Sequence, residues 1–232
     1  MSDGSAVPFY QTWIKALTQP NEGTYAAIAN SPNAKASTAY LWVFISSLVA
    51  SFFSIIVQEL TMSSQLSQAG FGDQGGNAMG TIAIAVICGA PIAAAIGTFF
   101  FALIVALIQW IAKMFGGRGT FDQLAYVFAA IGVPYSLISS VFILLSAIPY
   151  VGFCFRIILT LAGFYVLFLQ IMGTKAVNQF GWGPAAGSVL LPGLALVLVC
   201  VCLVGGLIAL AGGSGALGEI FNQINQSLQN AP

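Results

Sequence analysis

Residues 81–111 read TIAIAVICGAPIAAAIGTFFFALIVALIQWI, an apolar run without a charged residue. About 20 apolar residues in a helix are enough to cross the hydrocarbon core of a bilayer, so this run is longer than one straight span requires. Pro91 divides it. We predict that the span follows Pro91, and that residues 81–90 form a tilted, kinked or interfacial extension of it.

Four further apolar runs lie on either side of this one, and each is long enough for a membrane span. They cover residues 39–57, 121–148, 153–172 and 184–211. The sequence therefore predicts an all-α, polytopic membrane helix bundle with five spans. We expect residues 38–211 to form the membrane domain. A cytoplasmic segment, residues 1–37, precedes it, and a polar external tail, residues 212–232, comes after it.

The composition agrees with a lipid environment. Of the 232 residues, 59% are hydrophobic and 5% are charged, whereas about a quarter of a soluble protein is charged. The net charge is zero, which argues against nucleic acid as a partner, because phosphate binding needs concentrated Lys and Arg. The chain has no His, so it lacks the commonest acid–base residue and metal ligand. We predict no cofactor and no metal.

The basic residues predict an orientation. With five spans and a cytoplasmic N-terminus, Arg156 is the one basic residue on the outer half. The five on the cytoplasmic side are Lys15, Lys35, Lys113, Arg118 and Lys175. This positive-inside bias places the C-terminus outside. The tryptophans agree, because they lie near inner ends of spans, where they would form an aromatic belt: Trp13, Trp42, Trp110 and Trp182.

Residues 8–18 have the pattern of a short amphipathic helix. Its apolar face would hold Phe9, Tyr10, Trp13, Ile14 and Leu17. Such a helix lies on the inner leaflet, where Lys15 could meet lipid headgroups. It is either a membrane-resting anchor or a docking helix for a protein partner.

Small residues recur at every fourth position of the 81–111 run, at Thr81, Ala85, Gly89, Ala93 and Gly97. This spacing lines one helix face and allows another helix to approach closely. The stripe predicts packing against a neighbouring span or, alternatively, docking on another membrane protein.

The run 121–148 carries two local signals. Thr120 and Gln123 have the spacing of a capping box that begins a helix. Further on, Pro134 interrupts the run, with the hydroxyls of Ser136 and Ser139 after it. We interpret Pro134 as a packed kink, with helix–helix hydrogen bonds. The alternative is a polar cavity for a small ligand or a lipid headgroup.

Arg156 lies about one turn into the 153–172 run. Its long side chain could reach the outer headgroups. The alternative is a buried charge that needs an acidic partner, for which the outer side offers Glu59, Asp73 and Glu219.

Several classes of function lack their residues. An enzyme would need paired carboxylates in a span or a nucleophile–base pair, and we find neither. An ion-coupled carrier would need an acidic residue at mid-membrane, and the predicted spans have none there. We predict a non-enzymatic adaptor, organiser or accessory subunit that packs against other membrane proteins or lipid. The alternative is a small-solute channel or carrier, and a membrane enzyme comes third.

The segments WIKALTQP at 13–20 and GGRGTFDQ at 116–123, with Pro134 and five spans, resemble the Yip family of Ypt/Rab-interacting membrane proteins. The resemblance extends over residues 9–207. Eukaryotic members carry an Asp-Leu-Tyr-Gly-Pro motif that this sequence does not contain, so the chain looks more like the prokaryotic branch. The resemblance implies a non-enzymatic protein of a prokaryotic plasma membrane. Its partners would be lipid and other membrane-protein subunits, with a homo-oligomer as a further alternative.

Overall fold

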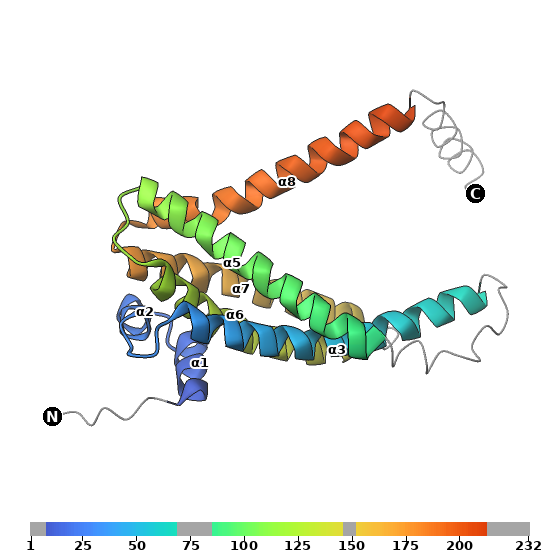
Figure 1. Ribbon diagram of the computed structural model, residues 1–232, viewed down its shortest axis with the longest axis horizontal. Coiled ribbons are helices and arrows are strands. Elements are labelled where there is room, and N and C mark those ends of the chain that lie inside the picture. The colour runs from blue at the N-terminus through green and yellow to red at the C-terminus, as the bar shows by residue number, and fades with distance from the viewer. Residues whose placement is uncertain (1–7, 69–84, 146–151, 213–232) are drawn as a thin grey trace. The chain divides into compact units, whose positions relative to one another are not determined.

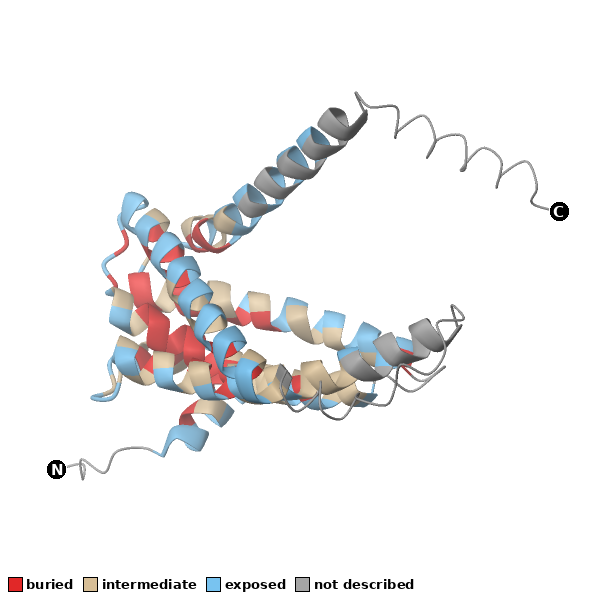
Figure 2. Cartoon of the chain, turned by 45° about the vertical axis from the view of Figure 1, so that its right-hand side comes forward, coloured by how far each residue is buried: buried red, intermediate tan, exposed pale blue. Residues whose placement is uncertain are grey.

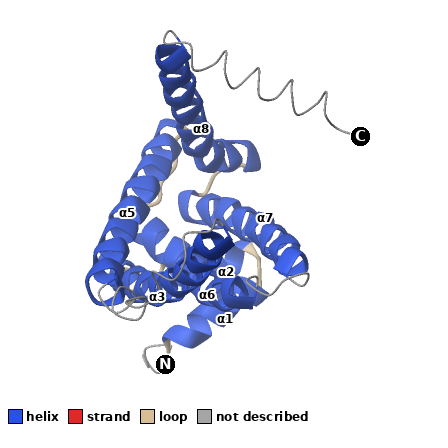
Figure 3. Cartoon of the chain, turned by 90° about the vertical axis from the view of Figure 1, so that its right-hand side faces the viewer, coloured by secondary structure: helices blue, strands red, loops and turns tan. Residues whose placement is uncertain are grey.

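The computed structural model describes residues 8–68, 85–145 and 152–212, and every regular element in these ranges is helical (Figure 3). The elements are α1 (Phe9–Thr18), α2 (Glu22–Ala29), α3 (Ala36–Gln68), the π-helical turn η2 (Ala85–Gly89), α5 (Ala90–Met114), α6 (Phe121–Leu145), α7 (Gly152–Asn178) and α8 (Trp182–Gly212). The all-α prediction is confirmed for these residues.

The chain divides into two compact units, residues 1–189 and residues 190–232. The first unit holds α1 to α7 and the first turns of α8. The described part of the second unit is the remainder of α8, residues 190–212. The bundle of packed helices therefore belongs to the first unit.

Four helices in the described ranges are long and apolar enough to cross a membrane. They are Ala36–Gln58, Val86–Met114, Phe121–Leu145 and Gly152–Asn178. This is the pattern of a polytopic membrane protein. The fifth predicted span falls on α8, which is 31 residues long. Its crossing, like the orientation of the termini, stays a prediction.

α3 is longer than the apolar run that predicts it. The run ends at Val57, whereas the helix continues through a polar stretch to Gln68. Residues 58–68 contain no Gly and no Pro, so nothing in them interrupts a helix. Hydropathy marks where a span ends, which need not be where its helix ends.

Pro91 shapes the next helix. It lies in the first turn of α5, directly after the π-helical turn η2. Because proline has no N–H, the carbonyl of Ile87 loses its usual donor, and a π-helical turn is one way for the backbone to accommodate this. The helix runs on through Gly89, and the candidate span begins at Val86. This candidate span begins about one helical turn before Pro91, whereas we expected the span to follow that residue. Where the membrane crossing begins stays a prediction, and residues 81–84 lie outside the described ranges.

α6 is the central helix of the first unit and contacts α1, α2, α3, α5 and α7. Residues 124–131 are all buried, so neighbours surround this stretch on every side. Figure 2 shows the buried residues gathered around the start of α6.

The N-terminal helices form a folded layer at this same end. α1 runs across α3 instead of alongside it (Figure 1). α2 packs against both α6 and α7. We call this arrangement, α1 and α2 on α6 and α7, the N-terminal layer.

Candidate functional site

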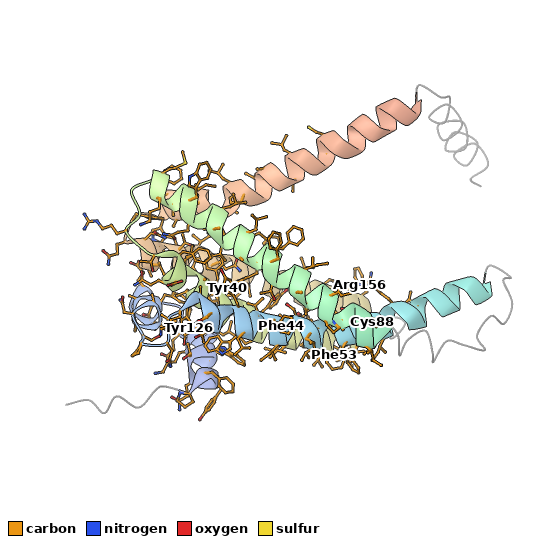
Figure 4. The ribbon with its side chains drawn as sticks, in the orientation of Figure 1. Tyr40, Phe44, Phe53, Cys88, Tyr126 and Arg156 are labelled. Atoms are coloured by element: carbon orange, nitrogen blue, oxygen red, sulfur yellow. The ribbon has the colours of Figure 1, made fainter. Side chains whose placement is uncertain are left out.

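The basic residues predicted to face the cytoplasm gather at one end of the first unit, which we call the basic end. It is formed by the N-terminal layer, the start of α3 and α6, and the ends of α5 and α7 (Figure 1). Arg156 lies at the opposite end from Tyr40 and Tyr126 (Figure 4). The segregation of charge that the sequence predicted is therefore present in the fold.

Two glycines of the loop between α5 and α6 lie against the end of α7. A Cβ atom on Gly117 would be 2.5 Å from Asn178 Oδ1 and 2.8 Å from the carbonyl oxygen of Ala112. One on Gly119 would be 2.5 Å from Val177 Cγ1. These contacts explain the Gly-rich sequence, because any side chain would push the loop away from α7.

Gln109 ties this loop to two helices. Its Nε2 donates to the carbonyl oxygen of Gly119 at 2.7 Å and to Asn178 Oδ1 at 3.2 Å. Asn178 Nδ2 donates back to Gln109 Oε1 at 3.3 Å. Both side chains are buried. Sequence reasoning missed this pair, although a lone Gln in an apolar run one turn from the basic end was a signal.

The predicted capping box is confirmed. The Thr120 amide donates to Gln123 Oε1 at 3.0 Å, and the Gln123 amide donates to Thr120 Oγ1 at 3.3 Å. Gln123 Nε2 also donates to Asn30 Oδ1 at 3.1 Å, which ties α6 to the end of α2. Asp122 Oδ1 accepts from the Ala36 amide at the start of α3. The loop and the first turn of α6 therefore contact three other helix ends: the end of α2, the start of α3 and the end of α7.

α1 is held on the bundle by aromatic contacts. The rings of Trp13 and Trp42 pack edge to face, with centroids 5.5 Å apart, and Trp42 packs on Tyr126 at 5.0 Å. Trp13 and Trp42 therefore contact each other, whereas Trp110 and Trp182 are exposed. The inner aromatic belt stays a prediction.

Two tyrosine hydroxyls satisfy the carbonyls at the end of α1. Tyr25 Oη donates to the carbonyl oxygen of Ala16 at 2.7 Å, and Tyr165 Oη donates to that of Leu17 at 2.7 Å. Burial and, to a lesser extent, the neighbouring Tyr165 raise the pKa of Tyr25 above the usual tyrosine range. The hydroxyl of Tyr25 therefore keeps the proton that it donates.

The predicted apolar face of α1 is divided in the structure. Trp13 and Leu17 pack against the core, whereas Phe9, Tyr10 and Ile14 are exposed. The bundle thus covers part of the apolar face of α1, and the rest of that face is exposed.

Lys175, near the end of α7, fastens α2. It forms an ion pair with Glu22 and lies over the ring of Trp182, 4.5 Å from its centroid. Trp182 stacks on Phe168 with the centroids 6.0 Å apart.

Two hollows flank α2. The larger, of about 410 Å³, lies between α1 and α2. The smaller, of about 160 Å³, lies between α2, the loop with Arg118 and Gly119, and the end of α7. In the described residues, no three His, Cys, Asp or Glu side chains come together as metal ligands would.

The stripe of small residues is not brought together on one contact surface. A Cβ on Gly97 would lie 3.5 Å from Ser47 Oγ, and one on Gly89 would lie 3.9 Å from Ile55 Cδ1, so both glycines face α3. Ala93 is exposed, and the buried alanines of α5 in this region are Ala90 and Ala94. Ala85 lies in η2, and Thr81 lies outside the described residues.

Around Pro134 the hydroxyls bond to their own helix. Ser139 and Ser140 both donate to the carbonyl oxygen of Ser136. Tyr135 Oη reaches across to the carbonyl oxygen of Leu159 in α7. Neither of the two hollows is lined by Pro134 or Ser136.

Arg156 is exposed on α7. It forms no ion pair with any residue whose side chain the structure describes. Of the proposed partners, Asp73, Glu219 and the side chain of Glu59 lie outside the described part of the chain.

Residues 14–218 match a family model, the Yip1 domain. The match includes the Gly-rich loop, Pro134 and all four candidate spans. No curated protein and no solved structure matches the chain.

Proposed function

The chain belongs to the Yip1 domain family, and from that premise we propose that it is a non-enzymatic membrane adaptor. Its docking surface is the N-terminal layer together with the loop between α5 and α6. Its partners are lipid and other membrane-protein subunits, and its location is a prokaryotic plasma membrane, with five spans and the basic end in the cytoplasm.

The observation that carries this proposal is how firmly the N-terminal layer is tied to the bundle. Three directed contacts from different elements hold it: Tyr165 to Leu17, Gln123 to Asn30, and Lys175 to Glu22. Within the layer, Tyr25 of α2 bonds to Ala16 of α1. A surface that is already ordered loses little conformational entropy when a partner binds, which favours recognition.

A small-solute channel or carrier is supported less well. Hydroxyls that are free to turn toward a solute are one way to line a path through the membrane. Six hydroxyls of the bundle instead donate to carbonyls of their own helices, namely those of Thr98, Ser139, Ser140, Thr160, Thr174 and Ser188.

Site-specific photo-crosslinking in the native membrane tests the adaptor function. A photoreactive residue at Gln11 or Ala27, both exposed on the N-terminal layer, should capture the same protein. The matched control is Ile157, which is exposed on α7 near Arg156. Replacing Tyr165 with Phe removes one tie of α1 and should reduce capture from Gln11.

Capture from Ile157 alone would contradict docking at the basic end. Absence of any captured protein, combined with solute flux through proteoliposomes of the purified chain, would favour the channel. Capture of a second copy of the chain from the layer would make the partner a homo-oligomer.

A further inference from the structure

We propose that the exposed apolar part of α1 lies against the acyl chains of the bilayer, in the leaflet at the basic end. We call this surface the aromatic edge; it consists of Phe9, Tyr10 and Ile14, each more than half exposed. The proposal goes beyond the adaptor function, because it requires only that α3 crosses the membrane. The juxtaposition that carries it is α1 lying across a candidate span, with its exposed apolar residues beside the exposed apolar side of that span.

α3 has a continuous row of exposed apolar side chains. The members of this row recur three and four positions apart, which places them on one side of the helix: Leu41, Ile45, Leu48 and Phe52. They belong to the candidate span Ala36–Gln58. An exposed apolar row on a helix that crosses a bilayer faces acyl chains, because the bilayer core holds no water.

α1 meets α3 at the edge of this row. The rings of Trp13 and Trp42 are in contact, and Trp42 neighbours Ile45 on the surface of α3, three positions away. Counted from Ala36 at the start of the candidate span, Trp42 lies about 9 Å along the helix axis. α1 runs across α3 (Figure 1), as a helix in the plane of the membrane does. Interfacial helices bury their apolar side at a similar depth, roughly 5–10 Å.

A chain of ring contacts connects the core of the bundle to the aromatic edge. Tyr126 is buried, Trp42 packs on it, and Trp13 packs on Trp42. Within α1, the ring of Phe9 lies 5.1 Å from that of Trp13 and 6.0 Å from that of Tyr10, between centroids. These contacts hold the aromatic edge in place on the bundle. Aromatic side chains are favoured where headgroups meet acyl chains.

The remaining exposed side of α1 is polar. Gln11 and Lys15 are four positions apart and share one face, and Tyr10 and Ile14 share the face beside it. Apolar residues on one face and a Lys on the next are typical of a helix that rests in the interface. Lipid therefore covers the aromatic edge, and the side with Gln11 and Lys15 is left for a protein partner.

Fluorescence quenching of the full chain in phosphatidylcholine vesicles tests the proposal. In a chain whose four native cysteines are replaced by Ala, Ile14→Cys carries a bimane label. Quenching is measured with lipid brominated in the upper part of its acyl chains and, separately, with iodide on both sides of the bilayer. We expect strong quenching by the brominated lipid and weak quenching by iodide. Lys15→Cys, at the next residue and on the polar side, is the matched control, and its ratio of bromine to iodide quenching should be several-fold lower.

Two results would overturn the proposal. Strong quenching of the Ile14→Cys label by iodide would place the aromatic edge in water. Quenching by neither agent would mean that protein covers it, and a disulfide-linked dimer of unlabelled Ile14→Cys would identify that protein as a second copy of the chain. Photo-crosslinking from Gln11 reports on the polar side of α1, so the adaptor function can fail while the quenching at Ile14 still supports contact with lipid.

Discussion

Gly117 and Gly119 show how a single missing side chain can position a whole loop. Both approach the last turn of α7 at distances that no Cβ atom tolerates, and Gly116 beside them has a φ of +83° that other residues rarely adopt. The close approach brings Gly119 and Asn178 within reach of Gln109. At this scale the Gly-rich motif is a packing device, and its basic residue Arg118 stays exposed.

Substituting Gly117 should destabilise the protein. In Gly117→Ala the new methyl group would lie 2.8 Å from the backbone oxygen of Ala112, which cannot turn away as a side chain can. We expect a loss of about 1–3 kcal/mol in unfolding free energy, seen as a lower melting temperature in detergent. Gly132→Ala in α6 is the control, because nothing lies within 4 Å of its Cβ position, and it should leave the melting temperature unchanged or slightly raised. Equal melting temperatures for Gly117→Ala and the wild type would show that the contact is not restrictive.

Tyr25 should make stability sensitive to alkaline pH. Its pKa is raised in the folded protein, so the native state holds a proton that the unfolded chain releases above about pH 10. The contribution of Tyr25 to stability is therefore complete below that pH, and it is lost as the pH rises through the folded-state pKa. The loss is at most about 1.4 kcal/mol per pH unit.

Denaturant unfolding between pH 8 and pH 11, roughly the range around the tyrosine pKa, measures this effect. Tyr25→Phe should flatten the dependence of unfolding free energy on pH, whereas Tyr10→Phe, at an exposed tyrosine, should not. An unchanged slope in Tyr25→Phe would contradict the role assigned to the Tyr25 proton.

α5 illustrates what an element can and cannot reveal by its sequence. Its length and its break near Pro91 follow from hydropathy and from the chemistry of proline, although the candidate span begins about one turn earlier than the expected one. Its small residues occupy more than one face. Gly89 and Gly97 approach α3, Ala90 and Ala94 are buried, and Ala93 points outward.

Substitutions at Gly97 and Ala93 should distinguish the two roles predicted for small residues in this helix, namely packing against a neighbouring span and docking on another membrane protein. Gly97→Ala should be tolerated, because its Cβ would make an ordinary 3.5 Å contact with Ser47. Gly97→Leu should force α5 from α3 and cost about 1–3 kcal/mol of unfolding free energy, measured by thermal unfolding in detergent. Ala93→Leu, at an exposed position on the same helix, should fold normally.

The proteins that co-purify with the Ala93→Leu variant then test whether α5 docks on another membrane protein. If this variant folds as the wild type does but no longer co-purifies with a protein that the wild type retains, the outward face of α5 is a docking surface. If Gly97→Leu melts as the wild type does, the contact with α3 does not restrict that position.

At the scale of the whole molecule, the order of the helices explains why the basic residues lie at one end. The antiparallel order of α3, α5, α6 and α7 brings the starts of α3 and α6 and the ends of α5 and α7 to one end, where the N-terminal layer also lies (Figure 1). The predicted basic residues come together there through topology alone. Orientation in the membrane depends on which side that end faces, and on whether α8 crosses.

Cysteine labelling should establish both points. In a chain whose four native cysteines are replaced by Ala, Arg118→Cys and Gln179→Cys should react only with a reagent in the cytoplasm. Gln65→Cys and Gln226→Cys should react only with a membrane-impermeant reagent outside. Reaction of Arg118→Cys from outside would show that the orientation is the opposite of the predicted one. Reaction of Gln226→Cys from the cytoplasm would show that α8 does not cross the membrane.

The sequence by itself determined the features that depend on neighbouring residues. Apolar runs predicted the helices that can cross a membrane, and the spacing of Thr120 and Gln123 predicted a helix start with both of its hydrogen bonds. Such features are local, because burial in lipid and capping each depend on residues within a few turns of one another.

Only the tertiary structure decided which surfaces meet. Gln109 and Asn178 are 69 positions apart in the sequence, and Tyr165 reaches Leu17 across 148 positions. Nothing in the period of hydropathy specifies such pairs, because a directed hydrogen bond depends on the relative placement of two helices and not on the apolar character of either. For the same reason the sequence predicted an amphipathic helix at residues 8–18 but not that the bundle would cover only part of its apolar face.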